Sequence, residues 1–237
     1  MKIAVMSDVH GFSLALERVL ADVAREPGIE EIVVAGDLVE GGPDPAGALA
    51  LLRASGAKLL MGNTDESYAH DPAGSGSHDF MSRHLTTSDR EFLAALPFSH
   101  RITPPGGQGP DDDLLAVHAN PHDLYRKFIP FSPVEHVAQL VGDTRASVIA
   151  FGHHHIAYKR QFGDMLLVDV SAVGNPKDGD LRSKWGLFSW DETTRTWTAE
   201  HRFVPYPLEE TVAQYREAGY PKAEAAIRKL KWASYIE

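Results

Sequence analysis

Five short polar motifs in this sequence carry residue types that bind metal ions. In chain order their potential ligands are Asp8 and His10 in SDVH, Asp37 in GDL, Asn63 in GNTD, His118 in AVHAN, and His153 and His155 in GHHH. Imidazole nitrogens combined with carboxylate and amide oxygens form a donor set that divalent transition metals favour. Taken singly, each residue has an ordinary explanation as a cap, a turn residue or a hydrogen-bonded core histidine.

Each motif follows an apolar run that has the length and composition of a β-strand. The runs are KIAVM, EIVVAG, AKLLMG, DDDLLAV and SVIAF, and each ends close to its potential ligand. Open α/β sheets bind ligands at the carboxyl ends of their strands, because the loops there converge while the strands hold them rigid. We therefore predict that the five motifs meet at one sheet edge and form a metal site.

The histidine run after SVIAF needs its own interpretation. If residues 153–155 stay extended, His153 and His155 point the same way and His154 points aside. The alternative is a solvated loop in which the three imidazoles have no common role.

The other elements that position these motifs follow from periodicity and capping signals. Helices are expected over 13–25, with Ser13 as the cap, and over 44–56, with Asp44 as the cap and Pro45 in the first turn. A capping box of Ser88 and Glu91 predicts a short helix to about Leu96, and 71–79 has the composition of a flexible loop.

Later in the chain we expect a helix in PVEHVAQLV and further helices after Pro207 and Pro221. Strands are expected in MLLVDV, WGLFSW and TWTAEHRFV, and the last two of these should form a hairpin. Alternating strands and helices in the first third indicate βαβ units and a largely parallel sheet there. Without an internal repeat or a linker, residues 1–237 are interpreted as one α/β domain.

Composition restricts the partners. The 237 residues carry a formal charge of −10, so a broad electrostatic surface for nucleic acid or an anionic membrane is not expected. There is no cysteine, which excludes disulfides, thiolate metal sites and cysteine nucleophiles. The N-terminal apolar run is too short for a signal peptide and no stretch has the length of a membrane span, so a cytoplasmic location is expected.

The order of the motifs resembles that of the calcineurin-like metallophosphoesterases. The motifs here are SDVH, GDLVEGGP, GNTD, VHANP and GHHH. The family pattern is D-x-H, G-D, G-N followed by His, Asp or similar, a histidine at a strand end, and G-H-x-H. The resemblance spans residues 7–155, and SAVGNPKDGD is similar to a loop in the small bacterial phosphodiesterase branch. It implies an α/β fold, a four-layer αββα sandwich of two mixed β-sheets flanked by helices.

This resemblance also implies two divalent metal ions, with manganese as the first choice and iron, zinc or magnesium as alternatives. The implied ligands are Asp8, His10 and His155 for one metal, Asn63, His118 and His153 for the other, and Asp37 as the bridge. Two such ions about 3.5 to 4 Å apart repel by roughly 15 to 20 kcal/mol at an effective dielectric near 20. We therefore expect the shared carboxylate to be the ligand least open to replacement.

The implied activity is hydrolysis of phosphodiesters or activated phosphate esters by a hydroxide that bridges the two metals, with Asn63, His118 and Asp37 as catalytic residues. A phosphomonoesterase or nucleotide phosphatase of the same fold is an alternative, as is a metal-dependent protein that binds a phosphorylated ligand with little turnover. The expected partner is a small phosphorylated substrate, and a homodimer is left open.

One position departs from the family pattern. Many relatives have a histidine after the motif asparagine, where it protonates the leaving group, and Asp65 would orient it; here Thr64 takes that place, and its hydroxyl is too weak an acid. This favours substrates whose leaving groups need no proton. His122 and His154 are candidates for a replacement acid, and a surface-loop position is the alternative for His122.

Candidate substrate contacts lie in NPKDGDLRSK, which offers Asn175, Lys177, Arg182 and Lys184, although a solvated surface turn explains this stretch equally well. Arg126 and Lys127 are a weaker second candidate.

Other histidine metal enzymes fit less well. Amidohydrolases carry H-x-H after the first strand, and metallo-β-lactamase-like hydrolases need H-x-H-x-D-H, whereas Ile156 and Ala157 follow the histidines here. Aspartyl phosphatases usually show D-x-D, and His10 replaces the second acid.

Overall fold

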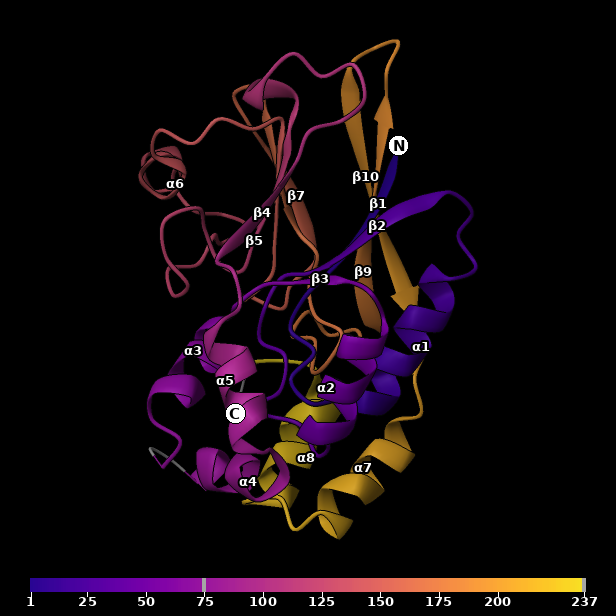
Figure 1. The fold of residues 1–237 in the computed structure, drawn as a ribbon, viewed down its shortest axis with the longest axis vertical. Coiled ribbons are helices and arrows are strands. Elements are labelled where there is room, and N and C mark those ends of the chain that lie inside the picture. Colours follow the sequence, from indigo (N-terminus) through magenta and orange to yellow (C-terminus); the bar gives the residue numbers. More distant parts are fainter. Residues whose placement is uncertain (74–75, 236–237) are drawn as a thin grey trace.

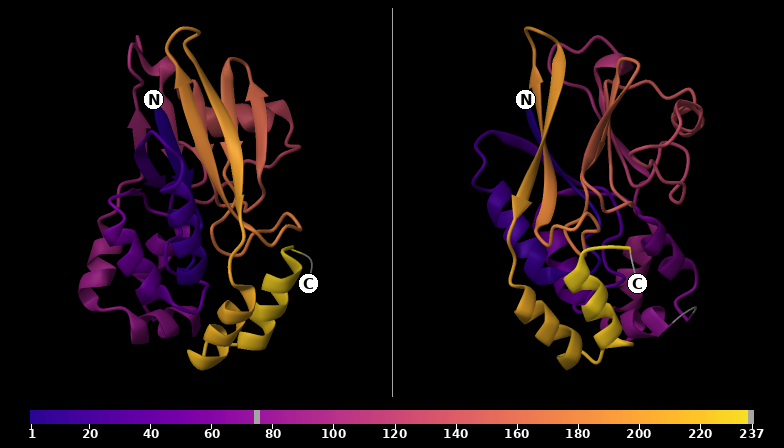
Figure 2. Two further views of the ribbon diagram at one scale, coloured as in Figure 1. Left: turned by 90° about the vertical axis from the view of Figure 1, so that its right-hand side faces the viewer. Right: turned by 180° about the vertical axis from the view of Figure 1, so that it is seen from behind.

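Two five-stranded sheets pack face to face in the computed structural model, which describes residues 1–73 and 76–235 (Figures 1 and 2). The sheet orders are β10-β9-β1-β2-β3 and β4-β5-β6-β8-β7. The strands are β1 (Lys2–Met6), β2 (Ile29–Val34), β3 (Lys58–Leu59), β4 (Ser99–Ile102), β5 (Leu114–Val117), β6 (Val148–Phe151), β7 (Tyr158–Phe162), β8 (Met165–Asp169), β9 (Ser183–Asp191) and β10 (Thr196–Val204).

Both sheets are mixed. In the first, β1, β2 and β3 run parallel, while β9 pairs with β1 and with β10 in antiparallel fashion. In the second, β5, β6 and β8 run parallel, and the edge strands β4 and β7 are antiparallel to their neighbours. The polar motifs follow the parallel strands β1, β2 and β3 of the first sheet and β5 and β6 of the second. The third parallel strand of the second sheet, β8, is followed by none of the five motifs.

Helices cover the outer faces and the lower end of the molecule (Figure 1). They are α1 (Ser13–Val23), α2 (Pro45–Ala54), α3 (Asn63–His70), α4 (Gly76–His84), α5 (Thr87–Ala94), α6 (Val134–Val141), α7 (Leu208–Glu217) and α8 (Ala223–Trp232). The helices α1, α2, α7 and α8 share one core with the first sheet, and α6 packs on the outer face of the second. None of the helices in the described part of the chain has the length and apolarity needed to span a membrane.

Alternation along the strands separates the cores. Ile3 and Val5 of β1 lie in the core between the sheets, whereas Ala4 and Met6 lie in the core shared with the helices. In β5, Ala116 belongs to the core between the sheets and its neighbours face α6. This period of two is what a strand buried on both faces produces, and the expected four-layer αββα arrangement is confirmed.

The capping signals were partly correct. The α2 helix begins at Pro45, and the Asp44 side chain accepts a hydrogen bond from the Gly47 backbone N–H at 2.9 Å, as predicted. The expected role of Ser13 was wrong, because it is the first residue of α1 and the N-cap, Phe12, makes no side-chain capping bond.

The capping box of α5 lies two residues earlier than predicted. Thr86 and Asp89 form it, because the Thr86 hydroxyl accepts from the Asp89 N–H at 3.2 Å and the Asp89 carboxylate accepts from the Thr86 N–H at 2.8 Å. The interpretation based on Ser88 and Glu91 was therefore wrong.

Part of the expected loop over 71–79 is helical. From Gly76 onward it forms α4, whose residues Phe80 and Met81 are buried, while residues 74–75 lie outside the described residues. Burial of the Phe80 and Met81 side chains in the folded protein outweighed the low helix propensity of the glycine- and serine-rich stretch that suggested a loop. The pattern also gave no indication of α3 or β7.

Candidate metal centre

The seven candidate ligands converge from two sheets and not from the edge of one. Three of the carrying loops follow β1, β2 and β3 of the first sheet, and two follow β5 and β6 of the second. Because the sheets pack face to face, their carboxyl ends lie side by side and loops far apart in sequence meet. The ligands are Asp8, His10, Asp37, Asn63, His118, His153 and His155, and their contacts define two groups.

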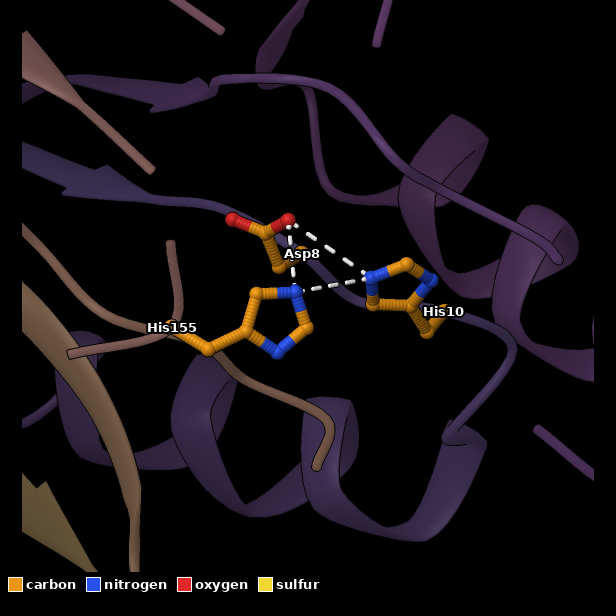
Figure 3. Close-up of side chains that lie close together, drawn as sticks. All are labelled: Asp8, His10 and His155. Atoms are coloured by element: carbon orange, nitrogen blue, oxygen red, sulfur yellow. Dashed lines mark hydrogen bonds and ion pairs between the residues drawn. The ribbon is translucent and has the colours of Figure 1, made fainter. Parts of the chain in front are cut away.

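The first group consists of Asp8, His10 and His155 (Figure 3). Asp8 Oδ1 lies 3.1 Å from His155 Nε2 and 3.5 Å from His10 Nε2, and the two Nε2 atoms are 3.1 Å apart. Asp8 is fully buried, and its Oδ1 accepts no hydrogen bond from any described residue. A buried carboxylate oxygen without a hydrogen bond, facing two ring nitrogens, fits a cation at their centre.

The second group consists of Asp37, His118 and His153, joined by Asn63. His118 Nε2 lies 2.9 Å from Asn63 Oδ1, 3.2 Å from His153 Nδ1 and 3.5 Å from Asp37 Oδ1. The two nitrogens and two oxygens form another mixed donor set that suits a divalent transition metal.

Asp37 belongs to both groups. Its Oδ1 faces His118, while its Oδ2 lies 3.6 Å from His10 Nε2 in the first group. The Thr64 backbone N–H donates to Asp37 Oδ1 at 2.9 Å, which helps fix the carboxylate orientation. One carboxylate thus presents one oxygen to each set of ligands.

Backbone carbonyls fix which ring nitrogen of each histidine faces inward. The Nδ1 atoms of His10, His118 and His155 donate to the carbonyls of Glu40, Ala35 and Asn175, at 2.5, 2.8 and 2.9 Å. His153 is reversed, because its Nε2 donates to the Tyr125 carbonyl at 2.9 Å. Since a carbonyl can only accept, the opposite nitrogen of each ring faces the centre, and when the ring is neutral this nitrogen offers its lone pair to a metal.

The local backbone is strained at most of these positions. Five of the seven residues have a left-handed conformation, with φ of 54° at Asp8, 51° at His10, 53° at Asp37, 66° at His153 and 58° at His155. Such values are uncommon outside glycine and persist only where the surroundings impose them. The expectation that the histidine run stays extended was therefore wrong: left-handed turns, and not strand alternation, send His153 and His155 to different groups.

Two motif glycines are required by close packing against the ligands. A Cβ on Gly62 would lie 2.1 Å from the Asp37 backbone nitrogen and 2.2 Å from its Oδ1, and a Cβ on Gly152 would lie 2.2 Å from Asp8 Oδ2. Neither glycine has a positive φ, so contact and not backbone conformation excludes a side chain.

The charges of the cluster reinforce one another. Burial by itself would raise the pKa of Asp8, yet His155 and His10 hold it well below its usual value. Burial opposes a charge on His10, but the nearby carboxylates of Asp8 and Asp37 raise its pKa to about 9. Burial and then repulsion by His118 lower the pKa of His153 to about 4. The carboxylates thus create a field that stabilises positive charge between them.

A pocket of about 320 Å³ opens over the cluster. Its lining residues are His10, Asp37, Glu40, Gly41, Asn63, Thr64, Lys127, His153, His155, Asn175 and Tyr235. A second pocket of about 360 Å³ shares the lining residues Glu40, Asn63 and Thr64 with it, so the two pockets adjoin at Asn63. A larger hollow of about 860 Å³ lies between the end of α1 and the start of β2, and no histidine lines it.

Asp65, which has no imidazole at position 64 to orient, connects two ligand-bearing loops. Its buried carboxylate accepts hydrogen bonds from the Leu38 and Gly62 backbone N–H groups, at 3.0 Å each, and so joins the loops that carry Asp37 and Asn63. The hydroxyl oxygen of Thr64 is buried and has no hydrogen-bond partner among the described residues.

Neither candidate for the replacement acid lines the pocket. His122 is exposed and its Nε2 donates to the Val141 carbonyl at 3.0 Å, next to the end of α6. His154 belongs to neither metal group and stacks on Tyr235 with ring centroids 5.5 Å apart.

The expected substrate contacts separate into two sets. Asn175 lines the pocket, and its Oδ1 accepts from Lys177 Nζ at 2.6 Å. Arg182 is exposed, pairs with Asp180 and lies over the Phe203 ring, and Lys184 is buried in an ion pair with Asp178. The structure therefore brings Asn175 and Lys177 near the centre but not Arg182 or Lys184.

Tyr235 is a pocket residue that the sequence did not indicate, because no local pattern marks it and only the path of α8 brings it there. Lys127, part of the weaker candidate pair, also lines the pocket, while Arg126 is exposed and bound to Asp123.

The sequence model of a protein family described as calcineurin-like phosphoesterase matches residues 1–157, which contain every strand end of the centre. The chain belongs to this family. An uncharacterized protein of Methanocaldococcus jannaschii is 26% identical over 213 residues, 78% of this chain and 82% of that protein. A symmetrical bis(5′-nucleosyl)-tetraphosphatase of Acidovorax sp. strain JS42 is 31% identical over 128 residues, 50% of this chain and 44% of that protein.

Solved structures share the fold of this family member over its whole length. A metallophosphoesterase from Sphaerobacter thermophilus superimposes with a TM-score of 0.79 and 24% identity, covering 98% of this chain and 100% of the other. A hypothetical protein from Pyrococcus horikoshii superimposes with a TM-score of 0.81 and 17% identity, covering 99% of each chain.

Proposed function

We propose that residues 1–237 act as one phosphoesterase domain that binds two divalent metal ions, manganese first among them, and hydrolyses phosphodiesters or activated phosphate esters. The observation that carries this proposal is Asp37, which presents Oδ2 to the group around His10 and Oδ1 to the group around His118. Two divalent cations held there would lower the pKa of bound water and would neutralise charge on the phosphoryl oxygens.

The chain's own residues hold and orient the reacting groups. Asp8, His10 and His155 would bind one cation, and Asn63, His118 and His153 the other, with the carbonyl hydrogen bonds keeping each imidazole lone pair directed inward. The amide of Asn63, at the border of the two pockets, can donate to a phosphoryl oxygen as its charge develops. Hydrolysis adds the water oxygen to phosphorus and breaks the bond from phosphorus to the leaving oxygen.

The leaving group determines the preferred substrate. Thr64 stands where an imidazole would protonate the leaving oxygen, and neither His122 nor His154 lines the pocket. A nitrophenolate or a phosphate leaves as a stable anion without a proton, whereas an alkoxide does not. We therefore expect faster cleavage of diesters with good leaving groups than of alkyl monoesters.

A nucleotide phosphatase that cleaves phosphoanhydrides is the second candidate. It is supported by the likeness to the tetraphosphatase, although that match spans 44% of the relative. A phosphate leaving group has a pKa near 6 and needs no acid at Thr64.

The test is a substrate panel with purified protein loaded with manganese, zinc, iron or magnesium. Bis(p-nitrophenyl) phosphate, ADP and an alkyl monoester are compared, and crystals soaked in manganese are examined by anomalous scattering. The proposal expects two anomalous peaks among the seven side chains and turnover of at least one of the first two compounds. Missing peaks would refute the metal centre, and binding without turnover would favour a phospho-ligand-binding protein.

A further inference from the structure

Lys127 is the one lysine or arginine among the residues that line the metal-centre pocket in the described chain. It lies in the segment between β5 and α6, half-buried, and faces the same 320 Å³ space as Asn63, His153 and His155. In a protein with a formal charge of −10, a cation in this position attracts anionic groups only locally.

No acidic residue neutralises the charge of Lys127 in the described part of the chain. Among residues 1–73 and 76–235, no carboxylate forms an ion pair with it, whereas Arg126 pairs with Asp123, Arg182 with Asp180 and Lys184 with Asp178. The Lys127 ammonium group lies over an aromatic ring, with Nζ 5.4 Å from the centroid of Tyr235. An aromatic face attracts an ammonium group but leaves its charge and its donors available to a ligand.

Tyr235 contacts His154 in two ways that place its ring next to Lys127. Its hydroxyl donates to the His154 carbonyl at 2.6 Å, and its ring stacks on the His154 imidazole at an interplanar angle of 19°. The segment that carries it is tied down by the Gly179 N–H, which donates to the Ala233 carbonyl at 2.9 Å. The His154 ring, the Tyr235 ring and the Lys127 ammonium group therefore lie in series beside the metal ligands.

We infer that Lys127, positioned by Tyr235, binds a second phosphoryl group of the substrate, so that the pocket takes compounds in which the reacting phosphate is joined to another phosphate. This inference rests on the proposed function, in which no residue has yet been assigned to a phosphate other than the reacting one. A compound with a single phosphate would leave the Lys127 ammonium without an ionic partner.

Equilibrium binding tests the inference without turnover. Calorimetric titrations of the manganese-loaded protein compare adenosine 5′-(α,β-methylene)diphosphate, which has two phosphorus groups and resists hydrolysis, with AMP, which has one. Lys127→Met is expected to weaken binding of the first compound about tenfold and of AMP less than twofold. Arg126→Met removes the same charge one residue away and is expected to change neither value.

Variants of Tyr235 separate positioning from general folding. Tyr235→Leu removes the ring beneath the ammonium and is expected to reproduce part of the selective loss, about three- to fivefold. Tyr235→Phe keeps the ring, loses only the bond to His154, and is expected to stay within twofold of the wild type. Circular dichroism melting curves establish that each variant is folded.

Steady-state kinetics add a second readout. With ADP as substrate, Lys127→Met is expected to raise KM about tenfold with little change in kcat, while kcat/KM for bis(p-nitrophenyl) phosphate stays within twofold. Equal losses for one- and two-phosphate compounds, or no loss for either, overturn the role of Lys127. Absence of any phosphate ester turnover by the wild type with all four metals overturns the proposed function instead.

Discussion

The carboxylate of Asp65 accepts hydrogen bonds from the Leu38 backbone N–H through both oxygens, at 3.0 and 3.2 Å. Through Gly62, whose N–H donates to the same carboxylate, this links the loop after β2 to the first turn of α3. Asp37 and Asn63 lie on the two sides of the link. The distance between these ligands thus depends on a residue that is not a ligand itself.

Replacing Asp65 should therefore affect both stability and the metal centre. Asp65→Ala leaves two buried N–H groups without an acceptor, and we expect a loss of about 2 kcal/mol in the free energy of unfolding. We also expect about tenfold weaker metal binding, as for other residues that orient ligands. Urea denaturation and metal titration measure the two effects.

Asp89→Ala is a matched control, because Asp89 occupies the same position at the start of α5 and lies away from the pocket. It should reduce stability without changing metal affinity. Equal metal affinity in the two variants would contradict the linking role of Asp65.

Asp37→Asn should abolish turnover without unfolding the protein. Asparagine tolerates the left-handed backbone at this position, but a neutral amide cannot offer an anionic oxygen to each of two cations. We expect kcat with bis(p-nitrophenyl) phosphate to fall by about 10³-fold or more, equivalent to roughly 4 kcal/mol. Elemental analysis should show fewer than two metals per chain.

Asp44→Asn is the control for this substitution. Asp44 caps α2, and asparagine caps a helix about equally well, so activity and metal content should remain as in the wild type. Near-normal activity of Asp37→Asn would be incompatible with a bridging carboxylate.

Gly62→Ala should lower activity because the added methyl group clashes with Asp37. The added Cβ would lie 2.1 Å from the Asp37 backbone nitrogen, and the backbone there cannot yield without moving the ligand. We expect at least a hundredfold loss of kcat/KM with the fold retained, measured alongside circular dichroism.

Gly76→Ala, at the start of α4, is the comparison, since the nearest atom to its Cβ, on Pro221, is 3.9 Å away. It should be neutral or slightly stabilising. If both glycine variants behaved alike, the close approach at Gly62 would be irrelevant to activity.

The buried carboxyl group of Asp169 should make the free energy of unfolding depend on pH. Burial raises its pKa well above 3.8, and its Oδ2 has no hydrogen-bond partner among the described residues. The folded protein keeps a proton that the unfolded chain releases, so this residue reduces stability progressively as pH rises above about 4. Asp169→Asn removes the ionisation, and its stability relative to the wild type should increase with pH by up to about 1.4 kcal/mol per unit.

Urea denaturation of metal-free protein at pH 5 and pH 8 measures the difference. Asp191→Asn is the contrast, because backbone N–H groups of Thr194 and Thr193 lower the pKa of Asp191, which is exposed. Its effect should not grow between these two pH values. A constant stability difference for Asp169→Asn would show that the buried carboxyl is not the source.

Several features were predictable because their causes are local. The apolar runs of β1 and β6 and the cap of α2 depend on neighbouring residues, and each was found where it was expected. The capping box at Ser88 and the loop over 71–79 were mistaken, because competing residues nearby and burial of Phe80 decided the outcome.

The sequence by itself determined which donor atoms this protein has, the order in which strand ends deliver them, and the family likeness that links them to metals. Only the tertiary structure showed which oxygen of Asp37 faces each group, that left-handed turns direct His153 and His155 apart, and that Lys127 meets Tyr235 beside the centre. The physical reason is sequence distance. Strand ends are set by nearby residues, whereas contacts between residues far apart in the sequence depend on how the two sheets pack and where the last helix ends.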